Sequence, residues 1–235
     1  MISLLNSVED KEKTIETYRE AVHDLRNSAS YFNSMIDDYR SEHQSPLSSC
    51  EKSFISLYEL INFRLDILHG DIDLTSVIEK HQKIHPLVVK LYHILKYKAE
   101  PKKVNVHISA NQANSFMITK SLYLSLFILM ENAIKYAKPQ TFVNIDFEED
   151  DNKTVIIIKN VSEKITEDAD YLLIKGNRGS NAQNSGKLGS GFGLAMSSEF
   201  LKKTNAKLEI ELDQKDKETT IFYTKISLFN PVQNS

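Results

Sequence analysis

Six of the seven glycines of this 235-residue chain lie in one segment, residues 176–194, which we call the glycine-rich lid. It ends in GSGFGL and leads into a helical pattern from Ala195 to Thr204. A glycine-rich turn before a helix presents free backbone N–H groups and the positive end of the helix dipole, which favour an anion. The spacing fits neither G-x-x-x-x-G-K-[ST] nor G-x-G-x-x-G. The segment predicts a phosphate-binding loop, with a flexible surface loop as the alternative.

A second group of reactive side chains ends an apolar helix predicted over residues 118–137, whose last turns read ENAIKYA before Pro139. Asn132 and Lys135 are three residues apart, so they share a helix face. Their side chains supply an oxygen ligand for Mg²⁺ and a cation for phosphate. The alternative is an ordinary polar helix end, where a lysine is favourable.

The third candidate is His23, in the sequence HDLRN. Asn27 follows four residues later on the same helix face, and Asp24 can reach the imidazole from the side. A carboxylate beside a histidine fixes its tautomer and stabilises its cation, which makes the ring a better base or nucleophile. A solvated surface histidine is the alternative.

Two helices must position His23. From Ile15 to Tyr39, apolar or small residues recur in steps of three and four, which is the seam of a long packed helix. A break at residues 41–46 separates it from a second amphipathic helix that stops near Gly70. We expect residues 1–72 to form a helical hairpin that pairs with its copy in a dimeric four-helix bundle, so the protein is predicted to be a homodimer.

Residues 73–235 have a different pattern. Helices are expected over 86–99, 118–137 and 192–203, and strands over 103–109, 141–147, 154–160, 207–212 and 219–228. An acidic hairpin turn at 148–152 joins two of the strands, and an irregular segment precedes the lid. This order predicts an α/β sandwich with helices on one face of a mixed, mainly antiparallel sheet, so the whole chain is α+β.

Composition limits the function classes. The net charge of −3 gives no footprint for nucleic acid. The single cysteine, Cys50, suits a reducing compartment. The N-terminus has no signal-peptide pattern, and the longest near-apolar run, residues 122–130, is too short for a membrane span. We therefore expect a cytoplasmic protein with no membrane segment of its own.

In order, HDLRN, ENAIKYA, a short polar stretch after a strand and GSGFGL resemble a bacterial sensor histidine kinase core, over about residues 15–228. The resemblance implies a dimerisation and phosphotransfer hairpin joined to a Bergerat-type ATP-binding domain of the gyrase/Hsp90/histidine kinase/MutL class. It implies that His23 accepts the γ-phosphoryl group, that Asp24 is the base, and that Asn27 orients water when the phosphorylated partner is dephosphorylated. Ser28 departs from the proline usual after this box.

The same resemblance implies ATP and Mg²⁺ as ligands, with Asn132 as the Mg²⁺ ligand. The other implied nucleotide-binding residues are Lys135 and Tyr136 near the phosphates and ribose, Gly189, Gly191, Gly193 and Leu194 at the phosphates, the lid cations Arg178 and Lys187, and Leu188 and Phe192 packed under the lid.

One box departs from the family pattern. The family's adenine site reads D-x-G-x-G, and the aligned positions here are Asn160, Ser162 and Lys164. Asparagine still accepts a hydrogen bond through its carbonyl oxygen. The lost charged hydrogen bond is worth about 1.5–3 kcal/mol, roughly a ten- to hundredfold change in affinity. We expect ATP binding to be weakened.

Three functions follow. The leading one is a histidine kinase that phosphorylates His23 and passes the phosphoryl group to an aspartate of a response regulator receiver domain. The alternative is a histidine phosphotransferase or pseudokinase scaffold with a degenerate ATP site. An ATP-hydrolysing relative is disfavoured because its glutamate, one turn before the asparagine, is Ile128 here. Since the first 14 residues are too few for a receptor, we expect input from a separate sensory partner, from a ligand of the dimer, or none.

Overall fold

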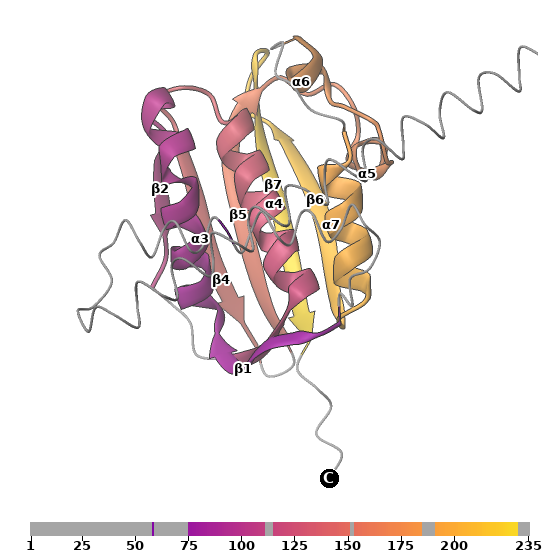
Figure 1. Ribbon diagram of the computed structural model, residues 1–235. Coiled ribbons are helices and arrows are strands. Elements are labelled where there is room, and N and C mark those ends of the chain that lie inside the picture. The colour runs from indigo at the N-terminus through magenta and orange to yellow at the C-terminus, as the bar shows by residue number, and fades with distance from the viewer. Residues whose placement is uncertain (1–57, 59–74, 111–114, 151–152, 185–190, 230–235) are drawn as a thin grey trace, which may run out of the picture. The chain divides into compact units, whose positions relative to one another are not determined.

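The computed structural model describes residue 58 and residues 75–110, 115–150, 153–184 and 191–229. The chain divides into two compact units, Met1–Ile72 and Asp73–Ser235, and the labelled elements of Figure 1 lie in the second. His23, Asp24 and Asn27 lie outside the described residues, so the helical hairpin and its dimer stay predictions. Lys187 and Gly189 of the lid lie outside them as well.

The second unit has a layer of helices on a five-stranded sheet, and a separate two-stranded sheet. Its elements are β1 (Val77–Lys83), α3 (Ile84–Ala99), η1 (Glu100–Lys102), β2 (Asn105–Ile108), β3 (Ser115–Thr119), α4 (Lys120–Tyr136), β4 (Phe142–Glu149), β5 (Lys153–Glu163), α5 (Ala169–Leu173), α6 (Ser180–Asn184), α7 (Gly193–Lys202), β6 (Ala206–Gln214) and β7 (Thr219–Phe229).

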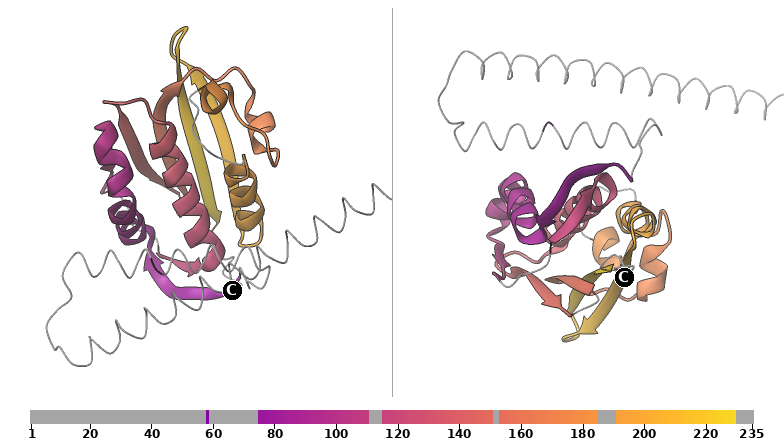
Figure 2. Two further views of the ribbon diagram at one scale, coloured as in Figure 1. Left: turned by 45° about the horizontal axis from the view of Figure 1, so that its top comes forward. Right: turned by 90° about the horizontal axis from the view of Figure 1, so that it is seen from below.

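Five strands pair in the order β2-β4-β5-β7-β6, with β2 parallel to β4 and the other neighbours antiparallel. Helices α3, α4 and α7 cover one face of this sheet (Figure 1). The right view of Figure 2 shows the helices and the sheet as two layers. This arrangement confirms the α+β prediction for the second unit.

Helix α4 is the centre of the core. It is buried on almost every side, from Ser121 to Ile134, because its sequence is apolar around most of its circumference. Thr119 starts it by accepting a hydrogen bond from the Leu122 N–H at 3.2 Å. Within the described ranges, every helix falls short of the length and hydropathy that a bilayer span requires.

Strand β5 lies behind α4 and alternates between buried and half-buried side chains. Its helix-facing positions begin with Thr154, Ile156 and Ile158, then change to the polar Asn160 and Ser162. Because alternate strand residues share a face, the predicted adenine-box residues 160 and 162 point to the side where the helices lie.

The structure adds elements that the sequence does not predict. Strands β1 and β3 form a two-stranded antiparallel sheet where a connector and the start of the α4 helix are expected. Phe116 and Ile118 are buried, but the equally apolar Val77, Ile78 and Met117 are exposed, so neither strand reads as an alternation of apolar and polar residues. Helices α5 and α6 lie where an irregular segment and the lid are expected; Asp168 caps α5 by accepting from the Tyr171 N–H at 2.7 Å.

Candidate functional site

The last turns of α4 pack against the start of α7. A Cβ atom added at Gly193 would lie 2.9 Å from Nδ2 of Asn132 and 3.2 Å from Cγ2 of Ile128. A side chain at position 193 would therefore displace the Asn132 amide. The structure brings together two predicted site residues that are far apart in sequence, and the glycine is what permits the approach.

The start of α7 has the features of an anion site. Its N-cap residue, Phe192, makes no side-chain capping bond, and the first turn holds no acidic residue. The Met196 N–H donates to the Phe192 carbonyl at 2.9 Å, so the N–H groups of Gly193, Leu194 and Ala195 precede the first bond of the helix. These groups and the helix dipole favour a negative charge beside Asn132.

Gly176 and Gly191 close the base of the lid. The Gly176 N–H donates to the Gly191 carbonyl at 3.2 Å. Gly191 has φ of +74°, and a Cβ atom there would lie 2.5 Å from the backbone oxygen of Asn177. Only glycine fits this turn without strain. The described ends of the lid are thus joined by their backbone.

The predicted phosphate cations occupy defined positions. The Lys135 Nζ lies 5.1 Å from the ring centroid of Tyr136, and both side chains are partly buried. The Arg178 Nη2 donates to the carbonyl of Ala182 at 2.7 Å, which ties this side chain to α6. Phe192 lies against Gly176 but is 39% exposed, so it is only partly packed under the lid. Contact of these residues with phosphate stays a prediction.

A buried polar patch lies where β5 and β7 pair. Asn160 is 3% exposed, and Ser162 and Thr220 are fully buried. Ser162 stands opposite Thr220 in the register, and its hydroxyl donates to the carbonyl of Glu163 at 2.8 Å. The exposed Lys164 side chain points away from the buried layer. Of Ser162 and Lys164, which stand where the family's adenine box has glycine, only Ser162 is buried.

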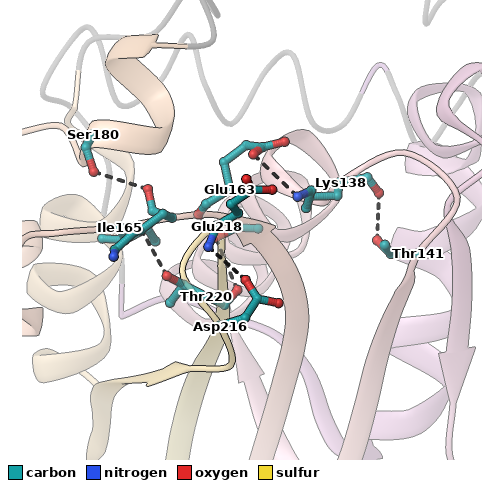
Figure 3. A network of polar contacts seen from close by, with 10 residues as sticks. Lys138, Thr141, Glu163, Ile165, Ser180, Asp216, Glu218 and Thr220 are labelled. Atoms are coloured by element: carbon teal, nitrogen blue, oxygen red, sulfur yellow. Dashed lines mark hydrogen bonds and ion pairs between the residues drawn. The ribbon is translucent and has the colours of Figure 1, made fainter.

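A network of polar contacts surrounds this patch (Figure 3). The Thr220 Oγ1 accepts from the Ile165 N–H at 2.9 Å, and the Lys138 Nζ lies 3.5 Å from Oε2 of Glu163. The side chain of Asp216 accepts from the Glu218 N–H at 2.8 Å. These contacts fix the chain around the end of β5.

Glu167 links the end of this network to the lid. Its Oε2 accepts from the backbone N–H of Ser180 at 2.8 Å and from the Ser180 hydroxyl at 3.0 Å. Partial burial raises the pKa of the Glu167 carboxyl, but hydrogen bonds from the Ser180 backbone and the Ser180 and Thr166 side chains outweigh it, so the pKa lies below its ordinary value. The negative charge thus holds the start of α6.

Two lysines that the sequence does not predict to have a role, Lys98 and Lys102, hold the end of α4. Lys98 forms an ion pair with Glu131, the residue before Asn132. The Lys102 Nζ donates to the carbonyls of Ile134 at 2.8 Å and Lys135 at 3.0 Å, and to that of Ala137. The partners in these contacts are 32 to 35 residues apart, so no local sequence pattern predicts that they meet.

The two ends of the site differ in how well they fit the predicted ligands. At the phosphate end, the Asn132 oxygen is of a type that suits Mg²⁺, and the start of α7, which has no side-chain cap, suits a phosphate. Gly193 permits the close approach of Asn132 to this helix start. At the base end, Asn160 keeps a polar group for a purine, but Ser162 occupies space that glycine leaves open in the family pattern.

Residues 117–229 match the family described as "Histidine kinase-, DNA gyrase B-, and HSP90-like ATPase". No curated protein matches the chain by sequence.

Three solved structures are similar in fold. The mycobacterial sensor histidine kinase MprB has a TM-score of 0.53 and 15% identity, over 65% of this chain and 99% of that one. The Acinetobacter baumannii histidine kinase AdeS has a TM-score of 0.50 and 14% identity, over 88% and 98%. Full-length ShkA in complex with AMPPNP has a TM-score of 0.54 and 12% identity, over 88% of this chain and 46% of that one. The second unit therefore has the fold of a histidine kinase-type ATP-binding domain.

Proposed function

Starting from an ATP-binding domain of the histidine kinase type, we propose that this chain is a histidine kinase. It transfers the γ-phosphoryl group of ATP to His23 and then to an aspartate in the receiver domain of a response regulator. The approach of Asn132 to Gly193 at the start of α7 supports the proposal, because the Asn132 amide, whose oxygen could hold Mg²⁺, lies beside a helix N-terminus suited to phosphate.

In the first step, a ring nitrogen of His23 forms a bond to the γ-phosphorus while the bond to the β,γ-bridging oxygen breaks. Asp24 takes the ring proton, and ADP leaves with the bridging oxygen. In the second step, the phosphoryl group passes from the histidine nitrogen to a carboxylate oxygen of the receiver domain. Both steps depend on positioning and charge neutralisation more than on covalent chemistry by the protein.

The described residues have defined tasks in this proposal. Asn132 would hold Mg²⁺, which neutralises phosphate charge when bound. The N–H groups of Gly193 and Leu194 would bind phosphate oxygens, with Lys135 adding positive charge. Ile128 packs against Gly193, so the position one turn before Asn132 is apolar and cannot activate water. This contact favours transfer to a side chain over hydrolysis.

The test is incubation of the purified protein with γ-labelled ATP and Mg²⁺, followed by acid and alkali treatment. Label that survives alkali but not acid, and that is absent from His23→Ala, identifies phosphohistidine at the predicted position. Label that persists in His23→Ala moves the acceptor elsewhere. The same proposal includes a homodimer, a receiver domain and a separate sensory partner. Measurement of the mass in solution tests whether the chain is a homodimer.

The alternative is a histidine phosphotransferase or scaffold. One observation favours it: Ser162 is fully buried and bonded to the chain, and Asn160 replaces the charged residue of the family's adenine site. In that case the protein takes no label from ATP but accepts it at His23 from a phosphorylated receiver domain. Incubation with such a donor separates the two functions.

A further inference from the structure

The C-terminal end of α4 has an unusual side-chain cap. The last carbonyls of a helix lack intrahelical partners, and cations favour that end. The Lys102 ammonium, from η1, donates to the carbonyls of Ile134 and Lys135 at 2.8 and 3.0 Å and to that of Ala137. One ammonium group, with three donors, thus serves three carbonyls of the helix end.

A second lysine contacts α4 about one turn before the carbonyls that Lys102 caps. Lys98, near the end of α3, pairs with Glu131, and these side chains are 34% and 17% exposed. Glu131 directly precedes Asn132, so the ion pair joins α3 to α4 next to the position predicted to bind Mg²⁺. Partial burial makes this pair less screened than a surface pair.

The end of α4 is held from the opposite side as well. The Lys138 N–H donates to the carbonyl of Val161 at 2.8 Å, and Ala137 bridges Ser162 of β5. The backbone of Lys102 also takes part, since its carbonyl accepts from the Gln140 N–H at 3.0 Å. The helix end is therefore fixed between η1 and the buried polar patch of β5.

We propose that Lys102 and Lys98 are positioning residues for the Mg²⁺–phosphate end of the site. They act through the α4 carbonyls and through Glu131, and they keep Asn132 at the distance from Gly193 that the bound phosphate requires. This inference rests on the proposed function.

The tight contact at Gly193 explains why small movements matter. Asn132 lies four residues before the end of α4, in the part of a helix that frays first. With only 2.9 Å between its amide and the Cβ position of residue 193, a shift of the last turn changes the geometry of the ligand oxygen. Removing groups that orient a metal ligand typically costs about ten- to a hundredfold in metal affinity or activity.

The experiment is calorimetric titration of the full chain with AMPPNP, in Mg²⁺ and in EDTA. Lys102→Met should weaken binding about tenfold in Mg²⁺ and clearly less in EDTA, and Lys102→Arg should restore most of the loss. Glu131→Gln, which keeps the side-chain shape, should show the same Mg²⁺-dependent loss at smaller size. The matched control is Lys96→Met, because Lys96 lies on α3, close in sequence to Lys102, and forms an exposed pair with Glu100.

The outcomes are distinct. Wild-type affinity in both Lys102→Met and Glu131→Gln overturns the inference and leaves the proposed function standing. Equal losses with and without Mg²⁺, with no rescue by arginine, show a purely structural role and overturn it too. If the wild-type chain binds no AMPPNP, the proposed function fails and the inference with it. If circular dichroism shows that Lys102→Met does not fold, Glu131→Gln and Lys98→Met test the inference instead. Wild-type AMPPNP affinity in both of these variants would then overturn it.

Discussion

The phosphate end and the base end of the candidate site differ in how closely their residues match the family pattern. At the phosphate end, Gly193 has no side chain that would clash with Asn132. The start of α7 has no side-chain cap and no acidic residue in its first turn. At the base end, the hydroxyl of Ser162 is buried and bonded within the protein, next to an uncharged Asn160. Phosphate recognition through backbone N–H groups requires that no side chain blocks those groups, whereas base recognition requires particular side chains. The described residues keep the features that the first requires, whereas Asn160 and Ser162 depart from the family pattern for the second.

Different elements form the two ends. The phosphate end lies between α4 and α7, and the base end lies on β5 and β7. They meet where Ala137, just after α4, bridges Ser162 of β5. Variants at each end test whether the two are energetically separate.

The largest effect is expected from Asn132→Ala. It removes the predicted oxygen ligand of Mg²⁺, so the affinity for Mg²⁺–AMPPNP should fall by on the order of a hundredfold or more, beyond the losses typical of groups that only orient a ligand. Affinity in EDTA should change little. Titration with AMPPNP in both conditions measures this. Unchanged affinity in Mg²⁺ would mean that Asn132 is not the ligand.

Gly193→Ala should have the next largest effect. The added Cβ would lie 2.9 Å from Nδ2 of Asn132, so the amide or the start of α7 must move. We expect about a ten- to hundredfold loss of Mg²⁺–AMPPNP affinity, comparable to the loss of a group that orients a metal ligand. Glu199→Ala, at an exposed position of the same helix, is the control. Full affinity in Gly193→Ala would show that Asn132 and the start of α7 can move apart without loss of binding.

The phosphate end is the part that the sequence predicts best. Apolar periodicity and Pro139 predict α4 nearly to its ends, and glycine spacing before an amphipathic stretch predicts the start of α7. Both signals are local. The closeness of Asn132 to Gly193 then follows from helices α4 and α7 sharing one face of the sheet.

Asn160→Asp addresses the base end. A charged acceptor is worth about 1.5–3 kcal/mol against about 0.5–1.5 kcal/mol for a neutral one, so ATP should bind about tenfold more tightly. Because Asn160 is 3% exposed, the free variant should be less stable, since a buried carboxylate without its partner is costly. Tighter binding with a lower thermal midpoint is the expected pair of results. No gain in affinity would mean that Ser162 closes the base end.

The sequence does not reveal how the base end is filled. Residues 160–164 align with a known box, but the burial of Ser162 depends on its pairing with Thr220, 58 residues later. The β1–β3 sheet and the Lys102 cap have the same origin, because partners distant in the chain create them. Periodicity reports which side of an element is apolar, and it contains no information about which polar groups meet across elements.

The smallest expected effect concerns the segment between the two ends. Glu167 holds the start of α6 through Ser180, and its lowered pKa means that the folded protein favours the carboxylate. This stabilisation is present above the ordinary pKa of 4.5 and is lost as the pH falls through the lower folded value. The thermal midpoint of wild type should exceed that of Glu167→Gln by about 1–2 °C at neutral pH, because solvent screens a partly exposed group.

The difference between the two midpoints should shrink below pH 4.5, when Glu167 itself becomes protonated. AMPPNP affinity at neutral pH should be the same in both proteins if the lid base is held by Gly176 and Gly191 alone. A clear loss of affinity in Glu167→Gln would show that the two ends are coupled through α6. The altered base end would then affect phosphate binding as well.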